Sequence, residues 1–210
     1  MAEAKICGLS TPESVEAALA GGAAFLGFMF FARSPRNVAP GRAAELARAA
    51  RGRARVVAVT VDPTDAELDA ILGVLAPDLV QLHGHETPAR TVEIAARVPV
   101  IKVLPVAVAA DLDAAEAYEG SATHLMFETK APPDADRPGG RGIPFDWSLM
   151  AGRRFRRPWL LAGGLNPDNA SEAVRRSGAP ILDVSSGVER APGLKDPALI
   201  EAFLRAARGA

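Results

Sequence analysis

Side chains that could carry chemistry follow several short apolar segments of this 210-residue chain. They include one thiol, several carboxylates and several cations, with two glycine- or serine-rich turns late in the sequence. The set is Cys7, Arg33, Arg36, Asp62, His83, Lys102, Glu128, the pair Gly163-Gly164 and the run Ser185-Ser186-Gly187. Groups of these types suit proton transfer on an anionic, phosphorylated substrate.

The two late turns are the clearest signal for an anion. Gly163 and Gly164 lead from an apolar segment toward a helix start at Asn166-Pro167, and the run from Ser185 to Gly187 repeats the arrangement. Glycine allows the backbone to approach a phosphate, while free N–H groups and a helix dipole favour negative charge. Ordinary tight turns that bind no ligand would give the same sequence pattern. The occurrence of two such turns in succession nevertheless favours a phosphate site.

Cys7 and Arg36 each permit two interpretations. A lone cysteine is often a small buried hydrophobic residue, and a free thiol with a pKa of about 8.5 needs that value lowered before it acts as a base near neutral pH. Arg36 is either a solvated loop cation or a fork that grips a carboxylate through two hydrogen bonds. Apolar residues 28–31 precede it, which favours the rim of a pocket.

A metal site is the alternative interpretation for His83, His85 and Glu86, which lie in one short turn. No further strong ligand set accompanies them, so we expect no metal and place His83 beside the site as a hydrogen-bonding group. His124 begins an apolar segment and is expected to be structural. The basic run 153–157 is expected in solvent, on the face of the protein opposite the reactive side chains.

Short apolar segments alternate with alanine-rich helical segments along the whole chain. Most are continuously apolar, which is typical of parallel strands covered on both faces. The predicted strands are 4–6, 24–28, 55–61, 79–82, 100–103, 124–127, 159–161 and 181–184. Eight strands with intervening helices predict an α/β protein, a (β/α)₈ TIM barrel in a single domain over residues 1–210, with a doubly wound open sheet as the competing fold. In a barrel, the ends of all eight strands would bring the reactive side chains together.

Capping residues and glycines mark the predicted helix ends. Expected starts are Ser10 with Glu13, Thr64 with Glu67, Thr87-Pro88, Asn166-Pro167 and Asp196-Pro197, and expected stops are Gly21-Gly22, Gly120 and Gly178. The irregular stretch 130–144 contains four prolines and three glycines. A loop of this length is typical of function in a barrel.

Composition excludes several classes of protein. Hydrophobic residues make up 49% of the chain and the formal net charge is −1. This balance predicts a folded core and no nucleic-acid or membrane partner. The single cysteine fits a reducing compartment, and no apolar run reaches the length of a membrane span, so we expect a soluble cytoplasmic protein.

Six motifs in order resemble those of the phosphoribosylanthranilate isomerase family. They are Lys5-Ile6-Cys7-Gly8; Gly27-Phe28 with Ser34-Pro35-Arg36; Val80-Gln81-Leu82-His83-Gly84; Gly139-Gly140-Arg141-Gly142 with Phe145-Asp146-Trp147; Leu161-Ala162-Gly163-Gly164-Leu165; and residues 183–189. The resemblance implies a cofactor-free Amadori rearrangement of N-(5-phosphoribosyl)anthranilate in tryptophan biosynthesis. It implies that Cys7 is the base, that Arg36 clamps the anthranilate carboxylate and that Asp183 meets the sugar. It also implies that the two late turns, with Gly163, Gly164, Ser185, Ser186 and Gly187, bind phosphate. His83 is expected to bind the substrate because of its own position beside the site.

The sequence departs from the family pattern at the general acid. The family has an aspartate after the sixth strand, where this chain has Glu128, whose stem is one methylene longer. A misplacement of about 1 Å can cost about 10²-fold in rate. Glu128 is therefore the expected acid, with Asp134 and Asp136 as substitutes, and Arg141 replaces a small polar residue of the family loop. Two alternatives stay open: another phosphosugar isomerase or epimerase, and a catalytically weak barrel that binds the phosphoribosyl ligand. A monomer is the default expectation for a small barrel, with a homodimer as the alternative.

Overall fold

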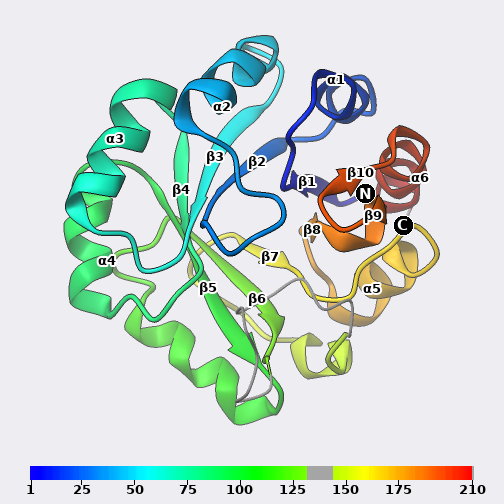
Figure 1. The fold of residues 1–210 in the computed structure, drawn as a ribbon. Coiled ribbons are helices and arrows are strands. Elements are labelled where there is room, and N and C mark those ends of the chain that lie inside the picture. The colour runs from blue at the N-terminus through cyan, green and yellow to red at the C-terminus, as the bar shows by residue number, and fades with distance from the viewer. Residues whose placement is uncertain (132–143, 210) are drawn as a thin grey trace.

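The computed structural model describes residues 1–131 and 144–209, and eight parallel strands form a closed barrel within them (Figure 1). Each strand pairs with the next along the chain, and β8 returns to pair with β1. The strands are β1 (Glu3–Cys7), β2 (Phe25–Phe30), β3 (Arg55–Thr60), β4 (Leu79–Leu82), β5 (Val100–Val106), β6 (His124–Thr129), β7 (Trp159–Leu161) and β8 (Ile181–Val184). This closure confirms the (β/α)₈ barrel and excludes the open sheet.

Alternating side chains of the strands fill two separate cores. One set points into the barrel, and its apolar members include Phe25, Val57, Val59, Leu79, Ile101, Val103, Met126, Leu160 and Ile181. The other set points outward and packs with the helices in a larger cluster that includes Ile6, Leu26, Phe28, Leu82, Phe127 and Phe203. Burial on both faces explains why the strands are continuously apolar in sequence.

The helices cover the outside of the barrel. They are α1 (Pro12–Ala20), α2 (Pro40–Ala47), α3 (Asp65–Leu75), α4 (Pro88–Ala95), α5 (Ala170–Ser177) and α6 (Pro197–Arg208). The 3₁₀ segments are η1 (Arg48–Ala50), η2 (Ala109–Ala117), η3 (Trp147–Met150) and η4 (Ser186–Val188). Among the described residues, η2 and η3 stand where regular α-helices would follow β5 and β6. No helix of the described ranges has the length and apolar character needed to cross a bilayer.

Most predicted helix caps are confirmed, and two are wrong. Thr64 caps α3 in a capping box with Glu67, and Thr87 and Asp196 cap α4 and α6. The first helix is capped by Thr11, whose side chain accepts from the N–H of Ser14, so the predicted Ser10–Glu13 pair is one residue early.

The second wrong start is at Asn166-Pro167. Helix α5 begins three residues later, after Asn169, because the Asn166 side chain accepts the N–H groups of Asp168 and Asn169 and holds a separate turn. At the helix ends, Gly21 and Gly178 are C-caps as predicted, while Gly120 lies in the turn that follows η2.

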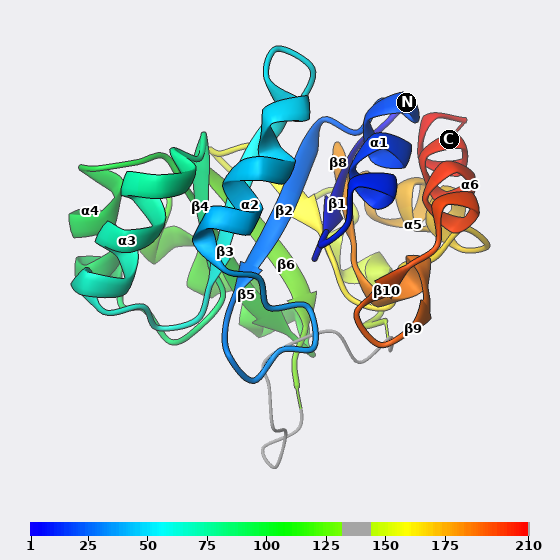
Figure 2. The ribbon, with the colours of Figure 1, turned by 45° about the horizontal axis from the view of Figure 1, so that its top comes forward.

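Among the described residues, the loops that follow the strands gather at one end of the barrel (Figure 2). The segment after β2 lies at this end, as does a short hairpin of β9 (Glu189–Ala191) and β10 (Leu194–Lys195) that the sequence did not predict. His124 lies at the start of β6, at the opposite end, and is buried against the edge of the Phe25 ring, as expected of a structural residue.

Candidate active site

Cys7 ends β1 and lines the barrel interior together with Lys5, two residues earlier. Lys5 is fully buried, and its Nζ lies 2.7 Å from Oδ1 of Asp183 on the adjacent strand β8. A β-carbon added to Gly27 of β2 would lie 3.1 Å from Lys5 Nζ and 3.2 Å from Cys7 Sγ. The amine and the thiol therefore border the same small space, which a glycine leaves open.

The environment of Cys7 sets its proton affinity through opposing effects. Burial raises the pKa of the thiol because it disfavours the thiolate. The positive charges of Lys5 and Lys195 lower the pKa, and the negative charge of Asp183 raises it, with a net result above the ordinary value. Cys7 is thus a protonated thiol at neutral pH in the free protein, with cations placed to favour its ionised form.

Glu128 and His83 form a second pair of reactive groups. Glu128 lies near the end of β6 and His83 follows β4, and His83 Nε2 is 2.6 Å from Glu128 Oε2. Burial would lower the pKa of His83, but the charge of Glu128 and its hydrogen bond outweigh burial and raise it. The short distance and the raised pKa describe an imidazolium held against a carboxylate.

Gln81 supports the His83 ring from within the barrel. Its side-chain amide nitrogen lies 3.3 Å from His83 Nδ1, and its amide oxygen is buried without a hydrogen-bond partner among the described residues. Rotation of the amide by half a turn would let that oxygen accept the Nδ1–H of a cationic His83. Either orientation fixes the ring so that Nε2 faces Glu128.

Arg36 is buried and makes a two-point ion pair with Glu189 of β9. Its Nε and Nη2 donate to the two carboxylate oxygens at 2.7 and 2.8 Å. Lys195 of β10 donates to the same carboxylate at 2.7 Å. Burial alone would raise the pKa of Glu189, but the hydrogen bonds and charges of Arg36 and Lys195 outweigh it and lower the pKa. The predicted clamp Arg36 therefore faces the barrel end with part of its fork already engaged.

The two predicted phosphate turns lie against each other. A β-carbon on Gly187 would collide with the backbone of Leu165, so only glycine allows this approach. Gly163 has φ +89° and packs against the side chain of Thr129 at the end of β6. Within the described residues, the N–H groups of Gly163, Gly164 and Gly187 donate to no hydrogen-bond acceptor.

Serine and lysine side chains connect this end of β8 to β1. The Ser185 hydroxyl donates to the carbonyl of Cys7 at 3.2 Å, and Lys195 Nζ donates to the carbonyl of Ser185 at 2.9 Å. The turn after β8 is thereby tied directly to the strand that carries the thiol.

Three of the residues singled out in the sequence lie apart from this centre. Lys102 points outward and pairs with Glu86 at 2.6 Å, and Arg33 is exposed. Asp62 accepts the backbone N–H of His85, whose side chain is 97% exposed. No group of three or more potential His, Cys, Asp or Glu metal ligands occurs in the described ranges. Asp134, Asp136 and Arg141 fall outside the described residues.

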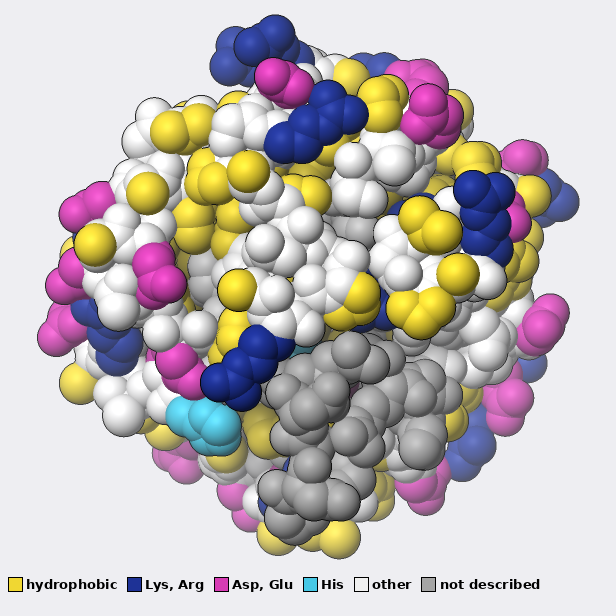
Figure 3. Space-filling model, viewed as in Figure 1, with side chains coloured by type: hydrophobic (Ala, Val, Ile, Leu, Met, Phe, Trp, Pro, Cys, Tyr) yellow, Lys and Arg dark blue, Asp and Glu magenta, His cyan; other side chains and the backbone are white. Residues whose placement is uncertain are grey.

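Figure 3 looks onto this end of the barrel. Basic and acidic side chains are interspersed around its rim, and the described residues show no large patch of one sign. The charged groups of the site are thus mostly interior, as the burial of Lys5, Arg36, Asp183 and Lys195 indicates.

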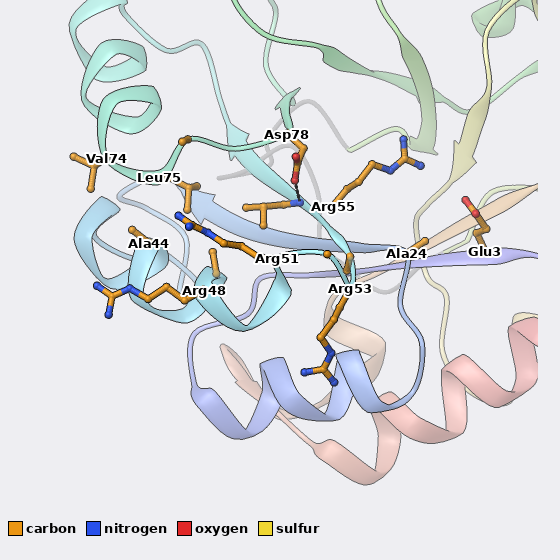
Figure 4. A pocket seen from close by; sticks show the side chains of 15 residues that line it. Glu3, Ala24, Ala44, Arg48, Arg51, Arg53, Arg55, Val74, Leu75 and Asp78 are labelled. Atoms are coloured by element: carbon orange, nitrogen blue, oxygen red, sulfur yellow. Dashed lines mark hydrogen bonds between the residues drawn. The ribbon is translucent and has the colours of Figure 1, made fainter.

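A cavity of about 920 Å³ lies at the opposite end of the barrel (Figure 4). Arg53 extends away from it to Glu16 at 3.2 Å, and Arg55 lies over the Phe25 ring at 3.9 Å. Asp78 accepts a backbone N–H at 2.7 Å. Arg53, Arg55 and Asp78 are engaged in these contacts, whereas the thiol of Cys7 and the imidazole–carboxylate pair lie at the other end of the barrel.

Sequence reasoning missed three charged residues of the site. Lys5 was detectable, because alternation along β1 places it on the same face as Cys7. Glu189 stood in a quoted motif without a role, and Lys195 gave no signal because its hairpin was not predicted. All three contact a predicted site residue: Lys5 contacts Asp183, Glu189 contacts Arg36, and Lys195 contacts Ser185.

A closed parallel barrel with a thiol, an imidazole–carboxylate pair and two glycine turns at the carboxyl end of its strands is typical of barrel enzymes that perform acid–base chemistry on phosphorylated substrates. Comparison with known proteins identifies the family. A family model described as "N-(5'phosphoribosyl)anthranilate (PRA) isomerase" matches residues 4–206, and this chain belongs to that family.

Individual relatives agree with this assignment. The chain is 60% identical to the N-(5'-phosphoribosyl)anthranilate isomerase of Caulobacter vibrioides, over 99% of this chain and 96% of the relative. It is 52% identical to that of Paramagnetospirillum magneticum, over 99% and 97%. The crystal structure of the Thermotoga maritima phosphoribosyl anthranilate isomerase superposes with a TM-score of 0.90 at 33% identity, with both chains fully covered. Another phosphoribosyl anthranilate isomerase structure, in complex with reduced 1-(o-carboxyphenylamino)-1-deoxyribulose 5-phosphate, gives a TM-score of 0.87 at 31% identity, again with both chains fully covered.

Proposed function

We propose that this chain converts N-(5'-phosphoribosyl)anthranilate to 1-(2-carboxyphenylamino)-1-deoxyribulose 5-phosphate, a step of tryptophan biosynthesis, with Cys7 as base and Glu128 as acid. The observation that carries the proposal is the shared electrostatic centre of the two groups. Lys5 and Asp183 act on the protonation of both Cys7 and His83, and His83 contacts Glu128. Membership of the isomerase family supplies the substrate.

Glu128 begins the reaction by passing a proton from the His83 imidazolium to the ring oxygen of the ribose. The bond between that oxygen and C1 breaks, and the lone pair of the anthranilate nitrogen forms a protonated Schiff base. The hydrogen bond from His83 holds the carboxyl group in place, which compensates for the longer stem of a glutamate. His83 supplies the proton that Glu128 passes on, and the imidazole is left neutral after the transfer.

Cys7 first loses its thiol proton to solvent, which the charges of Lys5 and Lys195 favour, and the thiolate then removes the proton from C2. The C2–H bond breaks, an S–H bond forms, and the electron pair becomes the C1–C2 double bond while the C=N pair returns to nitrogen. The resulting enolamine loses the proton of its C2 hydroxyl and gains one at C1, giving the ketone. Protons alone move, so the scheme uses no cofactor and no metal.

Arg36 is proposed to bind the carboxylate of the anthranilate ring. Glu189 occupies the Nε and one Nη2 hydrogen of its fork, which leaves three N–H donors for a ligand. In this arrangement Glu189 fixes the direction of the guanidinium before substrate arrives. His83 and Asp183, expected from the sequence to meet the substrate, are proposed to act mainly through Glu128 and Lys5.

The turns after β7 and β8 are proposed to bind the phosphate through the N–H groups of Gly163, Gly164 and Gly187 and the hydroxyls of Ser185 and Ser186. Their support is the close approach of the two backbones at Gly187 and the N–H groups that no described residue accepts. Backbone donors that converge on one space are suited to an anion.

The decisive experiment follows the fluorescence of the anthranilate adduct with purified wild type, Glu128→Gln and Glu128→Asp. We expect turnover by wild type, a loss of about 10²-fold or more in Glu128→Gln because a general acid is removed, and a smaller loss in Glu128→Asp. If the wild-type protein bound a product analogue tightly but did not convert the adduct, the result would instead indicate the catalytically weak barrel. Full activity of Glu128→Gln would place the acid elsewhere.

We further propose that the protein acts in the cytoplasm on a small-molecule substrate, without nucleic acid or membrane, as a monomer or a homodimer. The balanced charge and single cysteine support this setting. A Thermotoga maritima relative is described as dimeric. Light scattering coupled to size exclusion separates the two oligomeric states.

A further inference from the structure

Lys5 is a lysine with no exposed surface, at a position where a barrel would ordinarily carry an apolar side chain. Buried charges are rare and require partners, and a buried ion pair seldom stabilises a fold more than apolar side chains of the same volume. The pair of Lys5 with Asp183, whose residues are neighbours in the β1–β8 register, is therefore not explained by stability. The position of this ion pair near Cys7 indicates a role in the chemistry of the thiol.

The geometry places the Lys5 ammonium group and the sulfur of Cys7 around one small space. Both atoms border the space above Gly27, at 3.1 and 3.2 Å from the position that a β-carbon on this glycine would occupy. The side chain of Lys5 cannot swing away, because Asp183 fixes its Nζ at 2.7 Å and the barrel encloses it on every side. The ammonium is thus immobilised next to the atom that must become an anion.

The other charged groups around Cys7 do not provide the same support. Asp183 opposes the thiolate, and the charge of Lys195 has a smaller effect than that of Lys5. Lys195 is also engaged with Ser185 and with the carboxylate that binds Arg36. Arg36 lies beside the adjoining Gly8, but its charge is directed to that carboxylate.

His83 and Glu128, across the barrel, complete the set of charged groups around this centre. Their charges neutralise each other within one 2.6 Å contact, so they leave little net field at the sulfur. Lys5 itself stays charged: burial lowers its pKa, but the charge and hydrogen bond of Asp183, together with Cys7, outweigh burial and raise it.

We propose that Lys5, held by Asp183, is the positioning residue that stabilises the thiolate of Cys7 for removal of the C2 proton. This inference rests on the proposed isomerase function. Lys5 neither gains nor loses a proton in the step. It supplies a fixed positive charge to the sulfur before the C2–H bond breaks, and Asp183 supplies the anchor rather than a contact to the sugar.

The test measures the alkylation rate of Cys7 by iodoacetamide against pH, in wild type and Lys5→Met. Cys7 is the only cysteine in the chain, so the signal has a single source. We expect Lys5→Met to move the midpoint of the alkylation profile upward and to slow alkylation near pH 8 by about tenfold or more, because one pH unit corresponds to tenfold in thiolate population. Lys5→Arg should restore part of the rate.

The matched control is Lys102→Met. Lys102 is also a buried lysine of a barrel strand with a carboxylate partner at 2.6 Å, Glu86, but it faces the helices rather than the interior. Its replacement breaks a buried ion pair of the same kind and should leave the alkylation midpoint unchanged. A midpoint in Lys5→Met equal to that of wild type would overturn the inference.

A second pair of variants keeps the proposal testable if the single variants fail to fold. Lys5→Met with Asp183→Leu removes both buried charges, and Lys102→Met with Glu86→Gln is its control. The first double variant should still show a raised midpoint relative to the second, and equal midpoints would contradict the proposal.

Steady-state kinetics separate this inference from the proposed function. If wild type isomerises the substrate, Lys5→Met should lower kcat by about tenfold or more, with little change in KM and partial recovery at high pH. Absence of wild-type turnover would reject the proposed function, while the alkylation profiles would still decide the role of Lys5.

Discussion

Replacement of Gly27 by alanine tests how tightly the base is held. The new β-carbon would lie 3.1 Å from Cys7 Cα, 3.1 Å from Lys5 Nζ and 3.2 Å from Cys7 Sγ. Each distance is a few tenths of an ångström shorter than ordinary van der Waals contact. The backbone of Cys7 is fixed by its β-ladder pairing with Gly27, and Lys5 is fixed by Asp183, so the strain falls on both sides of the contact.

The size of the effect follows from overpacking and misplacement. Inserting a methyl group into a packed interior costs about 1–3 kcal/mol of unfolding free energy. A displacement of the sulfur of a few tenths of an ångström, with separation from the ammonium, should lower kcat by about tenfold, since about 1 Å costs about 10²-fold. The expected result for Gly27→Ala is a folded, moderately destabilised protein with reduced kcat and a KM close to wild type.

Gly73→Ala provides the control in the fluorescence assay and in urea unfolding. Gly73 lies in α3, and a β-carbon there would meet no atom within 4 Å. The same glycine-to-alanine change should stabilise the protein by about 0.5–1 kcal/mol through helix propensity and leave kcat unchanged. Wild-type kcat in Gly27→Ala would refute the argument that Lys5 and Cys7 share this confined space.

Three other variants probe the remaining parts of the site. Arg36→Lys should raise KM by about 10- to 100-fold with a smaller effect on kcat, because a point charge replaces a two-point fork; an unchanged KM would place the carboxylate elsewhere. His83→Asn should lower kcat by removing the partner of Glu128, and its stability deficit against wild type in urea should depend on pH. The pKa of His83 is raised on folding, so the deficit is fully present below about pH 6.5 and vanishes as pH rises through the folded-state pKa; a pH-independent deficit would contradict an ionic pair. Gly187→Ala should weaken binding of inorganic phosphate and of substrate because its β-carbon collides with the Leu165 backbone; unaltered phosphate binding in a folded variant would exclude this turn from the cradle.

Much of the fold could be predicted because the strands of a barrel have a simple hydrophobic pattern in the sequence. Strands buried on both faces are continuously apolar, and three of the eight, β4, β7 and β8, have the predicted bounds. Most of the others are longer in the structure, because polar residues such as Glu128 and Thr129 continue a ladder set by the neighbouring strand. A prediction from the hydrophobic pattern places the end of a strand where its apolar residues end, whereas the backbone pairing in the structure continues beyond that point.

The local errors share a physical cause. Ser10 and Thr11 are both good cap residues, and the choice between them depends on where Pro12 enters the first turn, which pattern does not fix. At Asn166-Pro167 the asparagine caps a separate turn rather than the helix. Competition between side-chain and backbone hydrogen bonds decides such cases.

The candidate site could likewise be predicted only in part. Cys7, His83 and Glu128 could be predicted because they stand at or near strand ends, which a barrel brings together. Which group each one contacts could not be read from the chain. The partnership of Arg36 with Glu189 joins residues 153 positions apart, and that of Lys5 with Asp183 joins residues 178 apart. Such pairs depend on closure of the barrel, which sequence spacing does not encode.

The most direct test of the proposed mechanism compares wild type with Cys7→Ser in the fluorescence assay, using anthranilate adduct that carries deuterium at C2 of the ribose. We predict that wild type consumes the adduct with a primary isotope effect on a step that breaks the C2–H bond. We also predict a loss of about 10²-fold or more in Cys7→Ser, since a hydroxyl is a far weaker base than a thiolate. Wild-type turnover by Cys7→Ser would contradict the assignment of Cys7 as the base.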